Sequence, residues 1–190
     1  MEHTHSKQTN LTLAPVSNAE RAAFRDLYRA AFPPEERKPL WLLDRLKRKG
    51  VSDLLSIRDG ARMIGLAVVA KSGDLALLDF FAIAPTERGK GYGARALRAL
   101  AKRYADKRLF LEIERIDEGA ANNAERLRRK AFYLRNGLTE SGFAVRMFGV
   151  ALEVMQFGAP LTYAEYRAFL ARAFGRGHLR FGRVREIQGE

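Results

Sequence analysis

The sequence has no cysteine, only three histidines and no long apolar run. Without cysteine, the chain cannot form disulfide bonds, thiolate metal sites or a covalent acyl-enzyme on a cysteine nucleophile. The histidines, His3, His5 and His178, lie near the two ends and outside the periodic segments that would hold a ligand rigidly. We interpret them as tail residues, and no metal site is expected.

No apolar run approaches the roughly 20 residues that a membrane-spanning helix needs. The first ten residues are polar, unlike the charged stub and apolar core of a signal peptide. These two absences predict a soluble cytoplasmic protein without a membrane partner.

Acidic residues are outnumbered, with 22 Asp and Glu against 34 Lys and Arg and a net charge of +12. Such a charge can attract nucleic acid, an anionic membrane or a phosphorylated small molecule. The sequence has no zinc-ligand spacing, basic zipper or aromatic RNA-binding motif, which argues against nucleic acid as the partner. The basic residues instead cluster within and after a glycine-rich stretch at residues 88–93, at 88–108 and again at 126–130.

A chain of 190 residues with 47% hydrophobic content can bury the core of one domain. We expect a flexible N-terminal tail at 1–10, a single domain at 11–175 and a basic C-terminal tail at 176–190. The oligomeric state stays open between monomer and homodimer.

The first half of the chain is typical of two helices and an antiparallel meander. After a strand at 11–16, Ser17 and Glu20 form a capping box that opens a helix, and Pro33 and Pro34 end it. A second helix is predicted at 39–49. Three β-like runs then follow, separated by glycine-containing turns; they span 53–58, 61–70 and 75–83.

The second half alternates helices and strands. A helix after the glycine-rich stretch and a strand at 109–114 predict a right-handed parallel crossover. The next helix begins near Asn122; its predicted buried stripe is Leu127, Ala131 and Leu134, with Tyr133 beside cations on the other face. Strands near 143–148 and 152–157 and a helix from Thr162 to Gly175 complete the domain.

Glycines at 89, 91 and 93 lie between a predicted strand and a predicted helix. They let the backbone approach a ligand closely, and the amides of a helix start bind phosphate. The spacing Gly89-x-Gly91-x-x-Ala94 also fits a dinucleotide fingerprint, with Glu112 or Glu114 near the distance of a ribose-binding acid. A Rossmann domain would not begin with a meander, so this alternative is disfavoured.

Two stretches resemble the GNAT acetyltransferases. Residues 77–93, LLDFFAIAPTERGKGYG, are similar to that family's signature through Arg88-x-x-Gly91-x-Gly93, and residues 132–138, FYLRNGL, are similar to its tyrosine-bearing helix end. In element order the resemblance covers about 11–157. It implies an α/β (α+β) GNAT fold: a mixed central sheet with an antiparallel N-terminal meander, splayed central strands and flanking helices.

The resemblance implies acetyl-CoA as the cofactor, with its pantetheine arm between the splayed strands and its pyrophosphate on the glycine loop. The amide of Ile83 would then lie near the thioester carbonyl. The implied coenzyme-binding residues are Phe81, Ala82, Ile83, Arg88, Gly89, Lys90, Gly91, Tyr92, Gly93, Ala94 and Arg129. Many relatives have an asparagine seven residues before the tyrosine, where this chain has Arg126.

The implied activity is direct N-acetylation of a primary amine, carried by a small molecule or a peptide, in a ternary complex. Tyr133 is implied as the acid that protonates the leaving thiolate. An amine with a pKa of about 10.4 must lose a proton before it attacks. Three carboxylates border the implied cleft and could take that proton: Asp79, Glu112 and Glu114. We choose Glu112 as the base and assign Asp79, Glu114 and Glu36 to the acceptor; for each acid an ion pair with arginine is the competing interpretation.

Two other functions stay open. A catalytically silent acetyl-CoA sensor would keep the glycine loop but have no acceptor. A dinucleotide-binding or nucleic-acid-binding protein is the further alternative.

Overall fold

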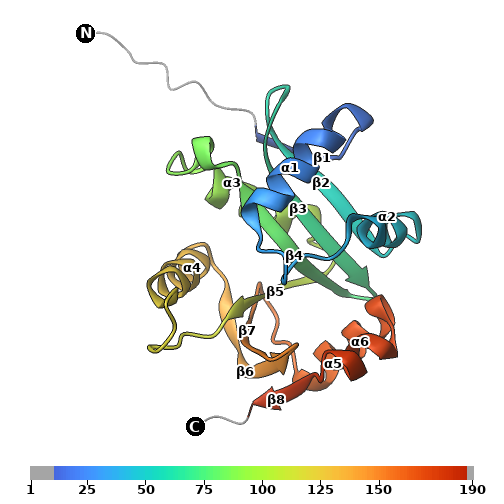
Figure 1. Cartoon of the computed structure of the whole chain (residues 1–190), viewed down its shortest axis with the longest axis vertical. Helices are drawn as coiled ribbons and strands as arrows, with labels where there is room; N and C mark the ends of the chain where they lie inside the picture. Colours follow the sequence, from blue (N-terminus) through green and yellow to red (C-terminus); the bar gives the residue numbers. More distant parts are fainter. Residues whose placement is uncertain (1–10, 188–190) are drawn as a thin grey trace.

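The computed structural model describes residues 11–187, which form one mixed eight-stranded sheet with helices on both faces (Figure 1). The strand order is β1-β2-β3-β4-β5-β7-β6-β8. This confirms the predicted mixed sheet. The expectation for residues 1–10 lies outside the described residues.

The N-terminal meander forms as its alternating runs and turns predict. The strands β1 (Leu11–Pro15), β2 (Ser52–Asp59), β3 (Arg62–Ser72) and β4 (Leu75–Ile83) pair antiparallel in order. Ser17 and Glu20 make the predicted capping box at the 3-10 turn η1 (Asn18–Glu20). It leads into α1 (Arg21–Ala31), which ends before Pro33 and is followed by α2 (Leu40–Arg48).

The crossover from β4 to β5 contains the glycine loop. The 3-10 turn η2 (Pro85–Glu87) and the loop precede α3 (Tyr92–Arg103), and β5 (Arg108–Glu114) follows. β5 runs parallel to β4 but pairs with it only from Leu75 to Leu77, opposite Arg108 to Phe110. Beyond these residues the two strands diverge, which confirms the predicted splay.

The second half of the sheet is built on β5. The helix α4 (Asn123–Arg135) leads to β6 (Thr139–Met147) and β7 (Val150–Gln156), and β7 inserts between β5 and β6. The helix α5 (Tyr163–Phe174) starts at the Thr162–Glu165 capping box. The chain then forms α6 (Arg176–Phe181) and β8 (Arg185–Ile187), which pairs with β6.

Apolar side chains fill both faces of the sheet. One face packs α3 and α4 against β5 through residues such as Leu97, Leu100 and Leu111. The opposite face carries α1 and α2 over β2 to β4, and α5 over β5 and β7. Because neighbouring strand residues point to opposite faces, Glu112 faces α5 while Leu111 faces α3.

The orientation of α4 differs from the prediction. Leu127 and Leu134, assigned to the buried stripe, are 47% and 44% exposed, whereas Tyr133 is 9% exposed and belongs to the core. The helix buries Tyr133, part of Phe132 and the stem of Lys130, whose ammonium contacts Glu140 and Glu153. The burial of aromatic side chains and the pairing of the lysine therefore decide which side of α4 faces the core, more than the stripe of aliphatic residues does.

The C-terminal region also differs from the prediction. Residues 176–187, expected to be part of a basic tail, form α6 and β8 and continue the sheet. His178, interpreted as a tail residue, lies within α6. The prediction missed both elements because each is short and rests on tertiary contacts. Residues 188–190 lie outside the described part of the chain.

Across residues 11–187, none of the helices has the length and hydrophobicity that crossing a bilayer requires.

Candidate active site

A cleft of about 1590 Å³ opens where β4 and β5 diverge. Its walls come from β4, the glycine loop, β5, α4, the α1–α2 loop, the β6–β7 turn and the end of α5. It brings together the predicted residues Glu36, Asp79, Phe81, Ala82, Ile83, Arg88, Gly89, Gly91, Tyr92, Gly93, Ala94, Glu112, Glu114, Arg129 and Tyr133. Lys90 is the predicted site residue that does not line it.

The diverging part of β4 turns main-chain donors toward the cleft. The amide of Ala84 donates to Ile64 of β3 at 2.8 Å, so the neighbouring amide of Ile83 points to the opposite edge of the strand. Two residues earlier, the amide of Phe81 has the same direction. Because β5 no longer pairs there, these two donors face the gap between the strands.

The glycine loop presents a second set of donors. Gly89 and Gly91 have φ of 76° and 75°, which side chains other than glycine rarely adopt. Counting from Gly89, the first amide that has a main-chain partner within residues 11–187 is that of Arg95, which donates to the carbonyl of Gly91 at 3.2 Å. The amides from Gly89 to Ala94 are therefore unpaired at the positive end of α3, an arrangement that suits a phosphate.

Gly93 allows α3 and α4 to approach closely. A Cβ atom on Gly93 would lie 3.1 Å from Cζ of Phe132 on α4. The third glycine is thus used for helix packing, while the first two shape the loop.

The loop's larger side chains mostly bind the protein itself. Nε of Arg88 donates to the carbonyl of Ile83 at 3.3 Å. Nζ of Lys90 donates to the buried Glu87 at 3.0 Å, and Arg62 contacts the same carboxylate. Lys90 is thus paired within the loop, and its predicted contact with an anion stays a prediction. The hydroxyl of Tyr92 donates to Asp59.

Glu112 lies on the cleft face of β5. The hydroxyl of Tyr166, buried in α5, donates to its Oε1 at 2.7 Å. Burial raises the pKa of Glu112 to about 7, with a further increase from Asp79, while the Tyr166 hydrogen bond and Lys38 act in the opposite direction. A carboxyl group with a pKa near neutrality can accept a proton and release it again at physiological pH.

Tyr133 projects from α4 toward the same cleft. Its ring packs against Phe132 at 5.3 Å between centroids, and its hydroxyl has no hydrogen-bond partner among residues 11–187. Burial raises the pKa of Tyr133 to about 12, with a smaller opposite effect from Arg129. The hydroxyl therefore keeps its proton at neutral pH and is available to a ligand.

Glu114 is engaged by cations of α4. Its Oε1 contacts Nη2 of Arg126 at 2.7 Å, and its Oε2 contacts Nη1 of Arg129 at 3.4 Å and accepts from Nδ2 of Asn122 at 3.2 Å. The ion-pair interpretation thus describes Glu114 better than a free acceptor-binding acid does. Arg126 also donates to the carbonyl of Arg115 at 2.8 Å.

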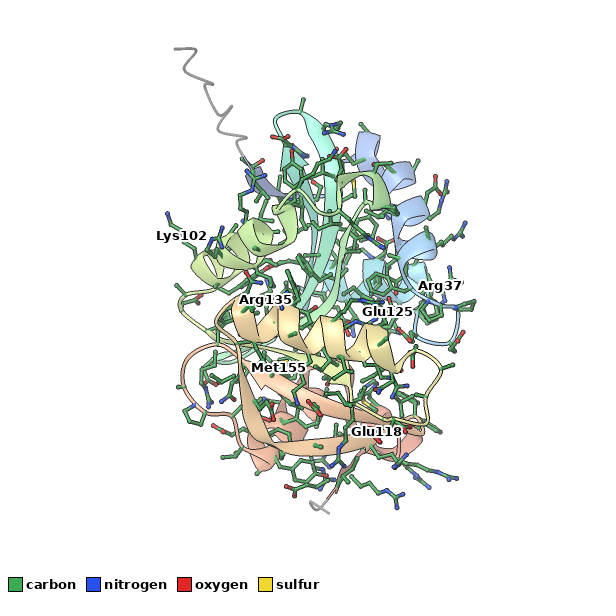
Figure 2. The ribbon with its side chains drawn as sticks, turned by 90° about the vertical axis from the view of Figure 1, so that its left-hand side faces the viewer. Arg37, Lys102, Glu118, Glu125, Arg135 and Met155 are labelled. Carbon is green, nitrogen blue, oxygen red and sulfur yellow. The ribbon has the colours of Figure 1, made fainter. Side chains whose placement is uncertain are left out.

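Glu36 lies on the α1–α2 loop, opposite the first turn of α4. Figure 2 shows this loop, marked by Arg37, beside the helix turn that carries Glu125. Burial raises the pKa of Glu36, and Glu114 and Glu125 raise it further while Arg129 lowers it. The loop and α4 thus form the two sides of the cleft mouth.

Asp79 is the extra residue of a β-bulge in β4. Val68 of β3 pairs with Phe80 and Val69 pairs with Leu78, so Asp79 has no ladder partner on β3. Its two carboxylate oxygens accept from Nζ of Lys38 at 2.6 Å. The bulge thus directs the carboxylate toward the α1–α2 loop.

Several side chains of the site were not predicted from the sequence. Lys38, Tyr166, Phe174 and His178 come from the α1–α2 loop, α5 and α6, which no motif links to the glycine loop. His178 lines the cleft and contacts Phe174, with ring centroids 5.1 Å apart. Burial lowers the pKa of His178 to about 4, and Lys38 lowers it as well, so the ring is neutral at pH 7.

Comparisons with known proteins agree with this architecture. Structures of similar fold include a GNAT-family protein from Bacteroides thetaiotaomicron, with 22% identity, a TM-score of 0.70 and coverage of 88% of this chain and 98% of that one. A GNAT family acetyltransferase from Elizabethkingia anophelis, solved with acetyl-CoA bound, has 17% identity and a TM-score of 0.57 over 79% and 99% of the two chains.

The ribosomal-protein-S18-alanine N-acetyltransferase of Escherichia coli has 18% identity and a TM-score of 0.58 over 80% and 96%. A search of the curated proteins finds no significant match. The family model described as "Acetyltransferase (GNAT) family" matches residues 21–136, which include β4, the glycine loop and Tyr133. The chain therefore belongs to the GNAT acetyltransferase family.

Proposed function

We propose that this protein transfers the acetyl group of acetyl-CoA directly to a primary amine. The observation that carries the proposal is a pair of donor sets that have no main-chain partner within residues 11–187: the amides of Phe81 and Ile83 on β4, and those of residues 89–94 at the start of α3. A thioester carried on a long diphosphate-bearing arm matches these two sets, because the strand amides suit its pantetheine amides and the loop suits its pyrophosphate. The acetyl-CoA-bound E. anophelis relative supports this choice of cosubstrate.

Glu112 acts as the base of the proposed reaction. An acceptor amine arrives mostly protonated at pH 7 and must lose a proton before its nitrogen can attack the thioester carbon. The pKa of about 7 makes the Glu112 carboxylate available for that proton, directly or through a water molecule. The hydrogen bond from Tyr166 of α5 holds the carboxylate in place.

The main chain of β4 and Tyr133 stabilise the charges that develop. The oxygen of the tetrahedral intermediate accepts from the amide of Phe81 or Ile83, a type of contact that contributes about 2.7 to 4 kcal/mol in other acyl transfers. When the carbon–sulfur bond breaks, Tyr133 donates its proton to the leaving thiolate. Its raised pKa keeps that proton in place until the thiolate forms.

Calorimetric titration with acetyl-CoA and then with NADH tests the cosubstrate. We expect acetyl-CoA to bind with a 1:1 stoichiometry and NADH not to bind. The reverse result would replace the proposal with the dinucleotide interpretation.

Release of free thiol across a panel of small amines and amine-bearing peptides tests the transfer itself. We expect thiol release that depends on one class of amine and yields an N-acetylated product. Tight acetyl-CoA binding without amine-dependent thiol release would indicate a sensor instead. The amine panel also contains peptides because the ribosomal-protein-S18-alanine N-acetyltransferase from E. coli is among the similar structures.

A further inference from the structure

One lysine side chain of the protein itself lies inside the cleft. Nζ of Lys38 donates to both carboxylate oxygens of Asp79 at 2.6 Å. The same atom lies 4.4 Å from the ring centroid of Phe174 and 5.4 Å from that of Phe80. A carboxylate and two aromatic rings thus surround a primary ammonium, which is the chemistry that selects such a group.

The environment of this ammonium is largely shielded from water. The side chains of Lys38 and Asp79 are only 19% and 9% exposed, and Phe80 is buried. Contacts between a charge and a carboxylate gain strength when water is excluded. We call the group formed by Asp79, Phe80 and Phe174 the ammonium site.

The main chain of Lys38 is fixed independently of its side chain. The hydroxyl of Tyr28 donates to the carbonyl of Lys38 at 3.2 Å, and the Tyr28 ring packs against Phe32 and Phe80. The four-carbon side chain can therefore leave the ammonium site by rotation about its own bonds while the loop stays in place.

The ammonium site lies beside the proposed base. Asp79 is on β4 and Glu112 on β5, at the level where the two strands separate, and both line the cleft. The charges of Asp79 and Lys38 both act on the ionisation of Glu112. An amine held at Asp79 is thus within reach of the group that would accept its proton.

We propose that the ammonium site binds the primary ammonium of an unbranched alkyl amine, the acceptor, in the place that Lys38 holds in the free protein. The Lys38 side chain is then an internal competitor that the acceptor must displace. The inference rests on the proposed function, because only that function makes the bound amine an acetyl acceptor. It adds the substrate class, a straight aliphatic chain that ends in a primary amine, either free or as a lysyl side chain.

Removal of the competitor should increase the apparent affinity for such an amine. When a site is open for only a fraction of the time, the apparent dissociation constant increases by the inverse of that fraction. A Lys38 side chain that fills the ammonium site about 90% of the time would weaken amine binding about tenfold.

The test is a calorimetric titration of Lys38→Ala with n-butylammonium chloride in the absence of acetyl-CoA. We expect binding at least about tenfold tighter than to the wild-type protein. Lys38→Met, which keeps the aliphatic stem but not the charge, serves as a second variant if the alanine variant is unstable. The double variant Lys38→Ala/Asp79→Asn should lose the gained affinity.

Arg37→Ala is the matched control. It removes the same charge from the adjacent residue, whose guanidinium donates to the carbonyl of Arg29 rather than to Asp79. We expect Arg37→Ala to bind n-butylammonium as the wild type does. Equal affinity of the wild type and both Lys38 variants, or unchanged affinity after loss of the Asp79 charge, would overturn the inference.

Two further ligands define the chemistry. tert-Butylammonium carries the same charge on a branched carbon and should bind Lys38→Ala more weakly than the straight isomer. A lysine with both backbone ends capped should bind as n-butylammonium does if the acceptor is a lysyl side chain, and more weakly if it is a free amine. Because amine binding is read without acetyl-CoA, failure of this inference and failure of the proposed acetyl transfer are measured separately.

Discussion

Tyr166 of α5 and Glu112 of β5 are joined by a hydrogen bond of 2.7 Å across the face of the sheet. Tyr166 is fully buried and its ring stacks on Tyr163, which keeps the hydroxyl oxygen beside the carboxylate. The burial of Glu112 raises its pKa, and the hydrogen bond partly offsets that increase. A helix far from the glycine loop in sequence therefore offsets part of the pKa increase that burial gives the proposed base.

Tyr166→Phe should shift the pH dependence of acetyl transfer. Loss of a hydrogen bond to the ionised carboxylate raises the pKa of Glu112 above its present value of about 7. The acid limb of the pH–rate profile should move up by about one pH unit. Tyr163→Phe is the control, since Tyr163 neighbours Tyr166 but does not bond to Glu112. An unshifted acid limb in Tyr166→Phe would show that Glu112 does not control this limb.

Glu112→Gln should lower turnover by about 10² or more, as expected for loss of a general base. The same change should stabilise the fold at high pH. The folded pKa of about 7 exceeds the ordinary glutamate pKa of 4.5, so ionisation costs the folded state stability as pH rises between these two values. Thermal denaturation should show a larger gain in Tm at pH 8 than at pH 5. A gain that is equal at both pH values would contradict the raised pKa.

Tyr133→Phe should lower kcat while leaving the affinity for acetyl-CoA nearly unchanged. The variant keeps the buried ring and its packing on Phe132 but removes the only proton donor of the side chain. The kinetic loss should be about 10² or more for an acid that acts on the leaving group. Tyr104→Phe, in which the lost hydroxyl contacts Asp53 away from the cleft, should retain kcat. Unchanged turnover in Tyr133→Phe would remove this residue from the mechanism.

Gly91→Ala should weaken acetyl-CoA binding more than Gly91→Asn does. Gly91 has a φ of 75°, and no atom lies within 4 Å of the position that a Cβ atom would take there. The cost of a side chain is therefore conformational and amounts to about 1 kcal/mol. Asparagine adopts this backbone conformation more readily than alanine. Calorimetry with acetyl-CoA compares the two variants, and equal affinities for both would show that the loop does not need the positive φ.

The sheet up to β7 and the place of the glycine loop could be predicted from the sequence. The meander, the crossover and the glycine loop follow from local patterns, because turns, periodicity and positive-φ glycines act within a few residues. The buried side of α4 was predicted wrongly. A count of aliphatic residues ignores that Tyr133 is buried and that the ammonium of Lys130 pairs with two carboxylates. Lys38, Tyr166 and His178 reach the site through tertiary packing, which no local pattern records.

The strand β8 has a consequence for the behaviour of shortened chains. It covers the open edge of β6 with only three residues and pairs with Ala144, Val145 and Arg146. In a chain cut after Gly175, the main-chain amides and carbonyls at this edge of β6 could pair with an edge strand of another molecule. The cut would also remove His178 from the cleft. This geometry implies that such a fragment would self-associate and would not behave as a monomer that has merely lost its C-terminal residues.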